Sequence, residues 1–221
     1  MLGKRCATTS LAIRFILELL NTRTTDTESV PVMFSLGSWN PATTSLRDWL
    51  TDQMVRDYPG LAALDHSGAS LARALVDDGR ILPVLDGFDE IAAGLRRAAL
   101  EALNAITTPL VVTSRPDEYA AAVASTDVLT AAAGIELDDL SLADLTDYLP
   151  RTTRKMTANS GHTAAAWDAL LACLRDQPGI PASRNLAAVL STPLMVALAR
   201  TIYSDTPEHD PAALLDPIPV T

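Results

Sequence analysis

The chain has 221 residues, 48% of them hydrophobic, and a formal net charge of −10. This acidity speaks against sequence-independent binding of DNA or RNA, which needs a basic face to neutralise phosphates. No uncharged apolar run is long enough to cross a bilayer, and the amino terminus lacks a signal-peptide layout. Cys6 and Cys173 lack the spacing of a disulfide framework or zinc site. We therefore expect a cytoplasmic protein with one large domain and a smaller appendage.

Alternating helices and strands are predicted over the first part of the chain, which is the pattern of a parallel sheet with helices on both faces. The first element is a helix at 11–20 that is apolar all round, as a helix buried under a sheet should be. The next elements, in order, are a strand at 30–36, helices at 45–57 and 70–77, a strand at 81–85, a helix at 95–105, a strand at 110–113, a helix at 118–125 and a short strand near 135–137.

From Ser141 onwards the pattern predicts helices only. Ser141 and Asp144 have the spacing of a capping box, with Asp in place of the usual Glu. Two further helices are predicted at 167–174 and 186–202, joined by a segment rich in proline and glycine. We therefore divide the chain into a core at 1–139, a helical subdomain at 140–204 and an extended, proline-rich tail at 205–221.

Three carboxylates follow the apolar strand at 81–85, and they are the most informative feature of the chain. Asp86, Asp89 and Glu90 lie at the carboxyl end of a strand that reads as buried on both faces, and this is where open α/β sheets bind ligands. Magnesium prefers oxygen ligands and usually sits beside nucleotide phosphates. The alternative is a solvated acidic turn after an ordinary strand.

A second apolar strand ends in Thr113, Ser114 and Arg115, and a parallel sheet brings that end to the same edge as the acids. Arginine stabilises the charge that moves during phosphoryl transfer, with fixed bidentate geometry. Alone, Arg115 is more typical of a surface ion pair. Together with the three acids it indicates a phosphate sensor.

These two strand ends resemble the NACHT group of STAND-type P-loop NTPases. The run Leu85-Asp86-Gly87-Phe88-Asp89-Glu90 fits the Walker B pattern of that family, and Thr113-Ser114-Arg115-Pro116 fits its sensor. Weaker likenesses lie at 30–36 and 45–50, and in the segment around Pro193, whose family counterpart packs near the adenine. The resemblance implies a P-loop NTPase parallel sheet with flanking helices, followed by a small helical subdomain.

The resemblance also implies roles for individual residues. Asp86 would hold Mg²⁺ through water, and Ser10 would be a direct metal ligand. Asp89 and Glu90 would position or activate the attacking water, with Glu90 as the base. Arg115 would sense the γ-phosphate of ATP or GTP.

The amino terminus departs from the family. A working phosphate loop reads G-x-x-x-x-G-K-[ST], in which the lysine reaches the β and γ oxygens. The best alignment places Gly3 first, Thr8 at the second glycine, Thr9 at the lysine and Ser10 at the hydroxyl, so two required positions are lost. The strand before the loop is reduced to the first two residues, which indicates a misplaced start codon, a truncated or decaying gene, or a strand supplied by a partner.

The sequence therefore predicts a NACHT-family nucleotide-binding signalling switch whose hydrolysis is weak or lost, because Thr9 replaces the lysine. Its expected ligand is a nucleotide. Its expected protein partners are further copies of the same chain or intact NACHT relatives. The alternatives are a nucleotide-independent pseudo-NTPase scaffold or a decayed gene fragment. Another P-loop ATPase, of AAA+ or RecA type, is disfavoured by the compact Asp-Gly-Phe-Asp-Glu run.

Overall fold

The structure is a computed structural model that describes residues 2–25, 28–124, 128–152, 161–204 and 211–215. Its contacts divide the chain into two compact units. Thr8–Glu136 form an α/β unit, and Leu137–Thr221, grouped with Met1–Ala7, form a helical unit. The division after Glu136 lies close to the predicted boundary after Asp139.

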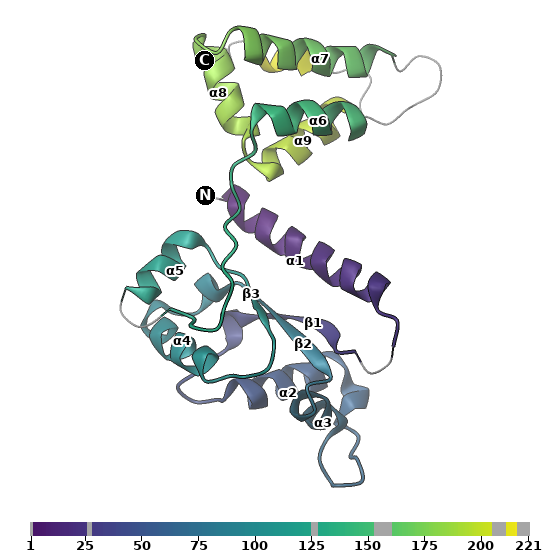
Figure 1. The fold of residues 1–221 in the computed structure, drawn as a ribbon, viewed down its shortest axis with the longest axis vertical. Helices are drawn as coiled ribbons and strands as arrows, with labels where there is room; N and C mark the ends of the chain where they lie inside the picture. Colours follow the sequence, from purple (N-terminus) through teal and green to yellow (C-terminus); the bar gives the residue numbers. More distant parts are fainter. Residues whose placement is uncertain (1, 26–27, 125–127, 153–160, 205–210, 216–221) are drawn as a thin grey trace. The chain divides into compact units, whose positions relative to one another are not determined.

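A parallel sheet of three strands forms the centre of the α/β unit (Figure 1). The strands are β1 (Val30–Ser35), β2 (Ile81–Asp86) and β3 (Val111–Val112), with β2 in the middle. Ser35 pairs with Asp86, and Leu85 pairs with Val112, so the three carboxyl ends lie together. The predicted strands at 30–36, 81–85 and 110–113 and the α/β class are confirmed.

Helices cover this sheet on both faces, with α2 and α3 on one side and α1 on the other (Figure 1). Ser45 and Ser70 cap α2 and α3, because each hydroxyl accepts a hydrogen bond from the backbone N–H three residues later. The helices of this unit are α2 (Leu46–Asp57), α3 (Leu71–Asp77), α4 (Arg96–Asn104), α5 (Pro116–Val123) and, from Thr8 onwards, α1 (Leu2–Thr22).

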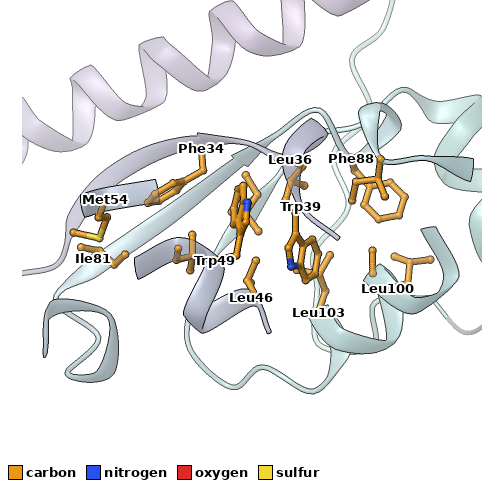
Figure 2. Close-up of a cluster of buried hydrophobic side chains, with 14 of the residues drawn as sticks. Phe34, Leu36, Trp39, Leu46, Trp49, Met54, Ile81, Phe88, Leu100 and Leu103 are labelled. Carbon is orange, nitrogen blue, oxygen red and sulfur yellow. The ribbon is translucent and has the colours of Figure 1, made fainter. Parts of the chain in front are cut away.

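The core of the α/β unit lies between the sheet and the helices α2 to α5 (Figure 2). The ring of Trp49 lies 6.0 Å from that of Phe34 and 6.2 Å from that of Trp39, measured between centroids. Phe88, in the turn after β2, is fully buried and meets Tyr119 of α5 edge-on. This core fixes the end of β2, where the acids lie.

The strand predicted near 135–137 is wrong. Ile135 is 88% exposed, and residues 132–140 have no regular secondary structure. A strand needs a neighbour to bond with, and β3, only two residues long, is paired with β2 alone among the described strands.

The prediction that the first helix begins near Leu11 and is buried all round is also wrong. Helix α1 begins at Leu2, and no proline interrupts the stretch from there to Thr22. Among the described side chains of α1, Ala12 alone is buried, and Leu11, Ile13, Phe15, Leu17 and Leu20 are 40–55% exposed. Only one narrow side of the helix faces the sheet.

The helical unit contains α6 (Leu142–Thr152), α7 (Gly161–Asp176), α8 (Pro181–Leu190), α9 (Pro193–Ser204) and the 3-10 turn Pro211–Leu215. The single helix predicted at 186–202 is in fact two, because Pro193 starts a new one. The predicted extended tail is interrupted by that 3-10 turn, in which Pro211 is buried. Residues 205–210 and 216–221 of the tail lie outside the described ranges.

Within those ranges, no single helix is long and apolar enough to cross a membrane. Helices α8 and α9 pass that length and composition test only together, and they are bent by 105° at the break between them.

The capping box at the start of α6 is confirmed. The Ser141 backbone N–H donates to Asp144 Oδ2 at 2.8 Å, and the Asp144 N–H donates to Ser141 Oγ at 3.2 Å. Hydrogen bonds from the Ser141 hydroxyl and N–H hold the pKa of Asp144 below its usual value. A carboxyl with a depressed folded pKa contributes stability above its unfolded pKa and loses it as pH falls through the folded one.

Ser141→Ala should therefore lower the urea midpoint of the helical unit at neutral pH, because it removes the cap and one donor to Asp144. The difference from the unchanged protein should narrow as pH falls below about 4, where an ordinary aspartate becomes protonated. Urea titrations of both proteins from pH 3 to pH 7 would measure this difference in midpoint. In an Asp144→Asn background the difference should not depend on pH, and a dependence there would contradict this explanation.

Candidate functional site

A tight turn after β2 brings the acids together with the end of β3. Gly87 takes a left-handed conformation with φ of 79°, and the 3-10 turn Phe88–Glu90 follows it. The backbone N–H of Phe88 donates to the carbonyl of Thr113 at 2.9 Å. We call the resulting group of Asp86, Asp89, Glu90 and Arg115 the acidic edge.

Both carboxylate oxygens of Asp86 accept hydrogen bonds from threonine hydroxyls. Thr9 Oγ1 of α1 donates to Oδ2 at 2.9 Å, and Thr113 Oγ1 donates to Oδ1. Thr113 Oγ1 in turn accepts from the Gly87 N–H at 3.0 Å. Ser10, the predicted metal ligand, is exposed on α1. The hydroxyl of α1 that contacts Asp86 is therefore that of Thr9 and not that of Ser10.

Asp89 and Arg115 form an ion pair, with 3.2 Å between Oδ2 and Nε. The side chain of Asp89 is 6% exposed and that of Arg115 is 29% exposed. Because Nε has no hydrogen bond of acceptable angle, the contact is electrostatic. Arg115 Nη1 also lies 3.6 Å from Glu118 Oε1. The predicted phosphate sensor is thus neutralised within the fold.

Glu90 is exposed and is oriented by Ser35 and two glycines. Ser35 Oγ donates to Glu90 Oε2 at 3.2 Å. A Cβ placed on Gly37 or on Gly87 would come within 2.9 Å of the Glu90 side chain. Ser35 was not among the predicted site residues, although it had a signal in the sequence: it is the polar residue near the end of a predicted strand that ends at the same edge as Asp86.

Gly87→Ala should lower the free energy of unfolding by about 1–2 kcal/mol, because a left-handed residue with a Cβ costs roughly that much and the new methyl would displace Glu90. Urea unfolding would measure the loss. Gly94→Ala is the matched control, since nothing lies within 4 Å of a Cβ there. Gly87→Asn should recover part of the loss, because asparagine tolerates the left-handed region. If Gly87→Ala and Gly94→Ala were equally stable, the proposed backbone strain at Gly87 would be contradicted.

A helix occupies the place of the predicted phosphate loop. Gly3, Thr8, Thr9 and Ser10 all lie within α1. A phosphate-binding loop needs glycines that free the backbone N–H groups from helical bonds, and the positive-φ glycines in the described ranges are found elsewhere. Pro193 is the first residue of α9, in the helical unit.

The magnesium ion that the resemblance implies does not fit this donor set. Asp86 accepts two hydroxyl hydrogens, Asp89 is paired with Arg115, and Glu90 accepts from Ser35. Across the residues that the structure describes, no three His, Cys, Asp or Glu side chains converge on one point. Magnesium demands near-octahedral oxygen coordination, and each carboxylate that would contribute to it already accepts a hydrogen bond or pairs with a cation.

A shallow hollow of about 430 Å³ lies in the helical unit, lined by Leu142, Ala143, Thr146, Asp147 and Arg175. It contains none of the predicted site residues. Comparison of the chain with models of protein families, with curated proteins and with solved structures finds no match.

Proposed function

We propose that the chain is a NACHT-type nucleotide-binding domain that acts as a cytoplasmic signalling switch and hydrolyses ATP or GTP weakly or not at all. The observation that supports this proposal is the acidic edge. Three acids and an arginine from two adjacent parallel strands gather at the carboxyl ends of the sheet, which is where open α/β sheets bind ligands.

Weak hydrolysis is expected because the groups that would stabilise the transferring phosphoryl are missing or occupied. Thr9 takes the place of a lysine, and it bonds to Asp86. Arg115 already pairs with Asp89, so a phosphate would have to compete with that carboxylate for the charge of the guanidinium. Catalysis of phosphoryl transfer depends almost entirely on positioning and electrostatic stabilisation. An arginine whose charge is already neutralised by Asp89 therefore adds little to the rate of hydrolysis.

Calorimetric titration with ATP and with GTP, each in the presence and absence of magnesium, tests this proposal. We expect saturable binding in the micromolar range that is weakened by Arg115→Ala and unchanged by Arg97→Ala. Arg97 is the matched control because it forms only an exposed pair with Glu101 on α4. Circular dichroism would first establish that each variant is folded. A folded chain that gives no binding heat with either nucleotide would refute nucleotide binding.

A second candidate function is a nucleotide-independent scaffold that pairs with intact relatives or with further copies. One observation favours it: each charged group of the acidic edge already has a partner inside the fold. Such an edge is electrostatically satisfied without a ligand. The same titration separates the two functions, since the scaffold predicts no binding heat.

A further inference from the structure

We propose that Asp86 is the anchor that holds helix α1 on the sheet, and that it is not a magnesium ligand. This inference does not depend on nucleotide binding. It concerns the carboxylate of Asp86 and the hydroxyls of Thr9 and Thr113, all of which belong to the α/β unit.

The carboxylate of Asp86 joins α1, β2 and β3. Thr9 Oγ1 reaches Oδ2 from α1 at 2.9 Å, and Thr113 Oγ1 reaches Oδ1 from the end of β3. The Gly87 N–H fixes the Thr113 hydroxyl at 3.0 Å. Hydrogen bonds to an ionised acceptor are about twice as strong as neutral ones, so Asp86 is an effective point of attachment.

Apolar packing contributes little to keeping α1 on the sheet. Ala12 is its one buried side chain in the described part of the helix, Ile16 and Leu19 are half-buried, and five other large apolar residues are 40–55% exposed. Partial burial of two side chains contributes less than full burial of them would. The position of α1 therefore depends strongly on the Thr9–Asp86 bond.

Release of α1 would be coupled to loss of its helical structure, because most of the stability of a helix in a protein comes from its tertiary contacts. Backbone hydrogen exchange within α1 thus reports on its attachment. A cation bound at Asp86 would have to share the two oxygens with the hydroxyls of Thr9 and Thr113, so metal binding and the anchor compete for the same carboxylate.

Hydrogen exchange of the full chain, measured by mass spectrometry on peptides covering 11–20, tests the anchor. Thr9→Val keeps the shape of the side chain and removes its hydroxyl. We expect exchange in α1 to become roughly tenfold faster, as the loss of one hydrogen bond to a charged group implies. Thr9→Ser should restore the original rate.

Thr22→Val is the matched control. It removes the same hydroxyl from the same helix, but that hydroxyl bonds only to the carbonyls of Glu18 and Leu19. We expect less than a twofold change at 11–20. If Thr9→Val also left exchange unchanged, Asp86 would not anchor α1.

Titration of the unchanged protein with Mn²⁺ alone, followed by electron paramagnetic resonance, tests the second half of the proposal. We expect no saturable binding that depends on Asp86. Saturable binding that disappears in Asp86→Asn would overturn it. Neither measurement uses nucleotide, so a failure of ATP or GTP to bind would refute the proposed function and leave this inference standing.

Discussion

Trp167→Ala should lower the free energy of unfolding of the helical unit by about 3–5 kcal/mol, the usual cost of truncating a large buried aromatic residue. Trp167 is fully buried and meets Tyr203 edge-on at 6.4 Å between ring centroids. Urea unfolding followed by circular dichroism would measure the loss. Trp167→Phe keeps an aromatic ring at this buried position, so it should lower the free energy of unfolding clearly less than Trp167→Ala does. A cost below about 1 kcal/mol for the alanine variant would contradict the packing of this core.

The effect should stay within the helical unit, because the two units have separate cores. Trp167 packs with Leu145, Leu149 and Leu170, and none of these belongs to the core around Phe34 and Trp49. Hydrogen exchange in β2 should therefore be unchanged in Trp167→Ala, while exchange in α6 and α7 should rise. Faster exchange in both units would show that they unfold together.

Arg115→Ala should destabilise the α/β unit by about 2–3 kcal/mol, because it leaves the carboxylate of Asp89 buried without its cation. We expect less than the full cost of breaking a buried pair, since Arg115 is itself 29% exposed and partly screened by water. Urea unfolding without nucleotide would measure the loss. Arg97→Ala removes an exposed pair and should cost at most about 0.5 kcal/mol.

Combining Arg115→Ala with Asp89→Asn should recover most of that stability, because the remaining side chain is then neutral. If the double variant is no more stable than Arg115→Ala, the arginine acts through packing and not through charge. Recovery would establish that Arg115 serves the fold first, so any contact with a phosphate would have to compete with that role.

The strands and several helix starts could be predicted from the sequence because their signals are local. Short apolar runs predicted β1 and β2 almost to the residue. Ser45, Ser70 and Ser141 lie at three predicted helix starts; each caps its helix, and for Ser141 the capping box itself was predicted. A capping hydroxyl acts on the next turn of backbone, so its effect does not depend on the rest of the fold.

The attachment of α1 could not be predicted, because it depends on which side of an all-round apolar helix meets the sheet. Neighbouring residues on a helix differ by about 100° in direction, so the choice between Thr9 and Ser10 is decided by packing alone. The break at Pro193 did have a local signal, since proline favours the first turn of a helix and disrupts its interior. The apolar pattern that continues across Pro193 favoured a single helix and hid that signal.

The glycines around Glu90 also define what a search for relatives should look for. The acids alone occur at the ends of many strands, whereas the close approach of Glu90 to Gly37 and Gly87 admits no other side chain without displacement. A sequence with Ser-x-Gly at the end of one strand, Asp-Gly-x-x-Glu at the end of the next and Thr at the end of a third has the parts of this edge. Such a spaced signature would identify distant homologues by their geometry, even where overall sequence identity has faded.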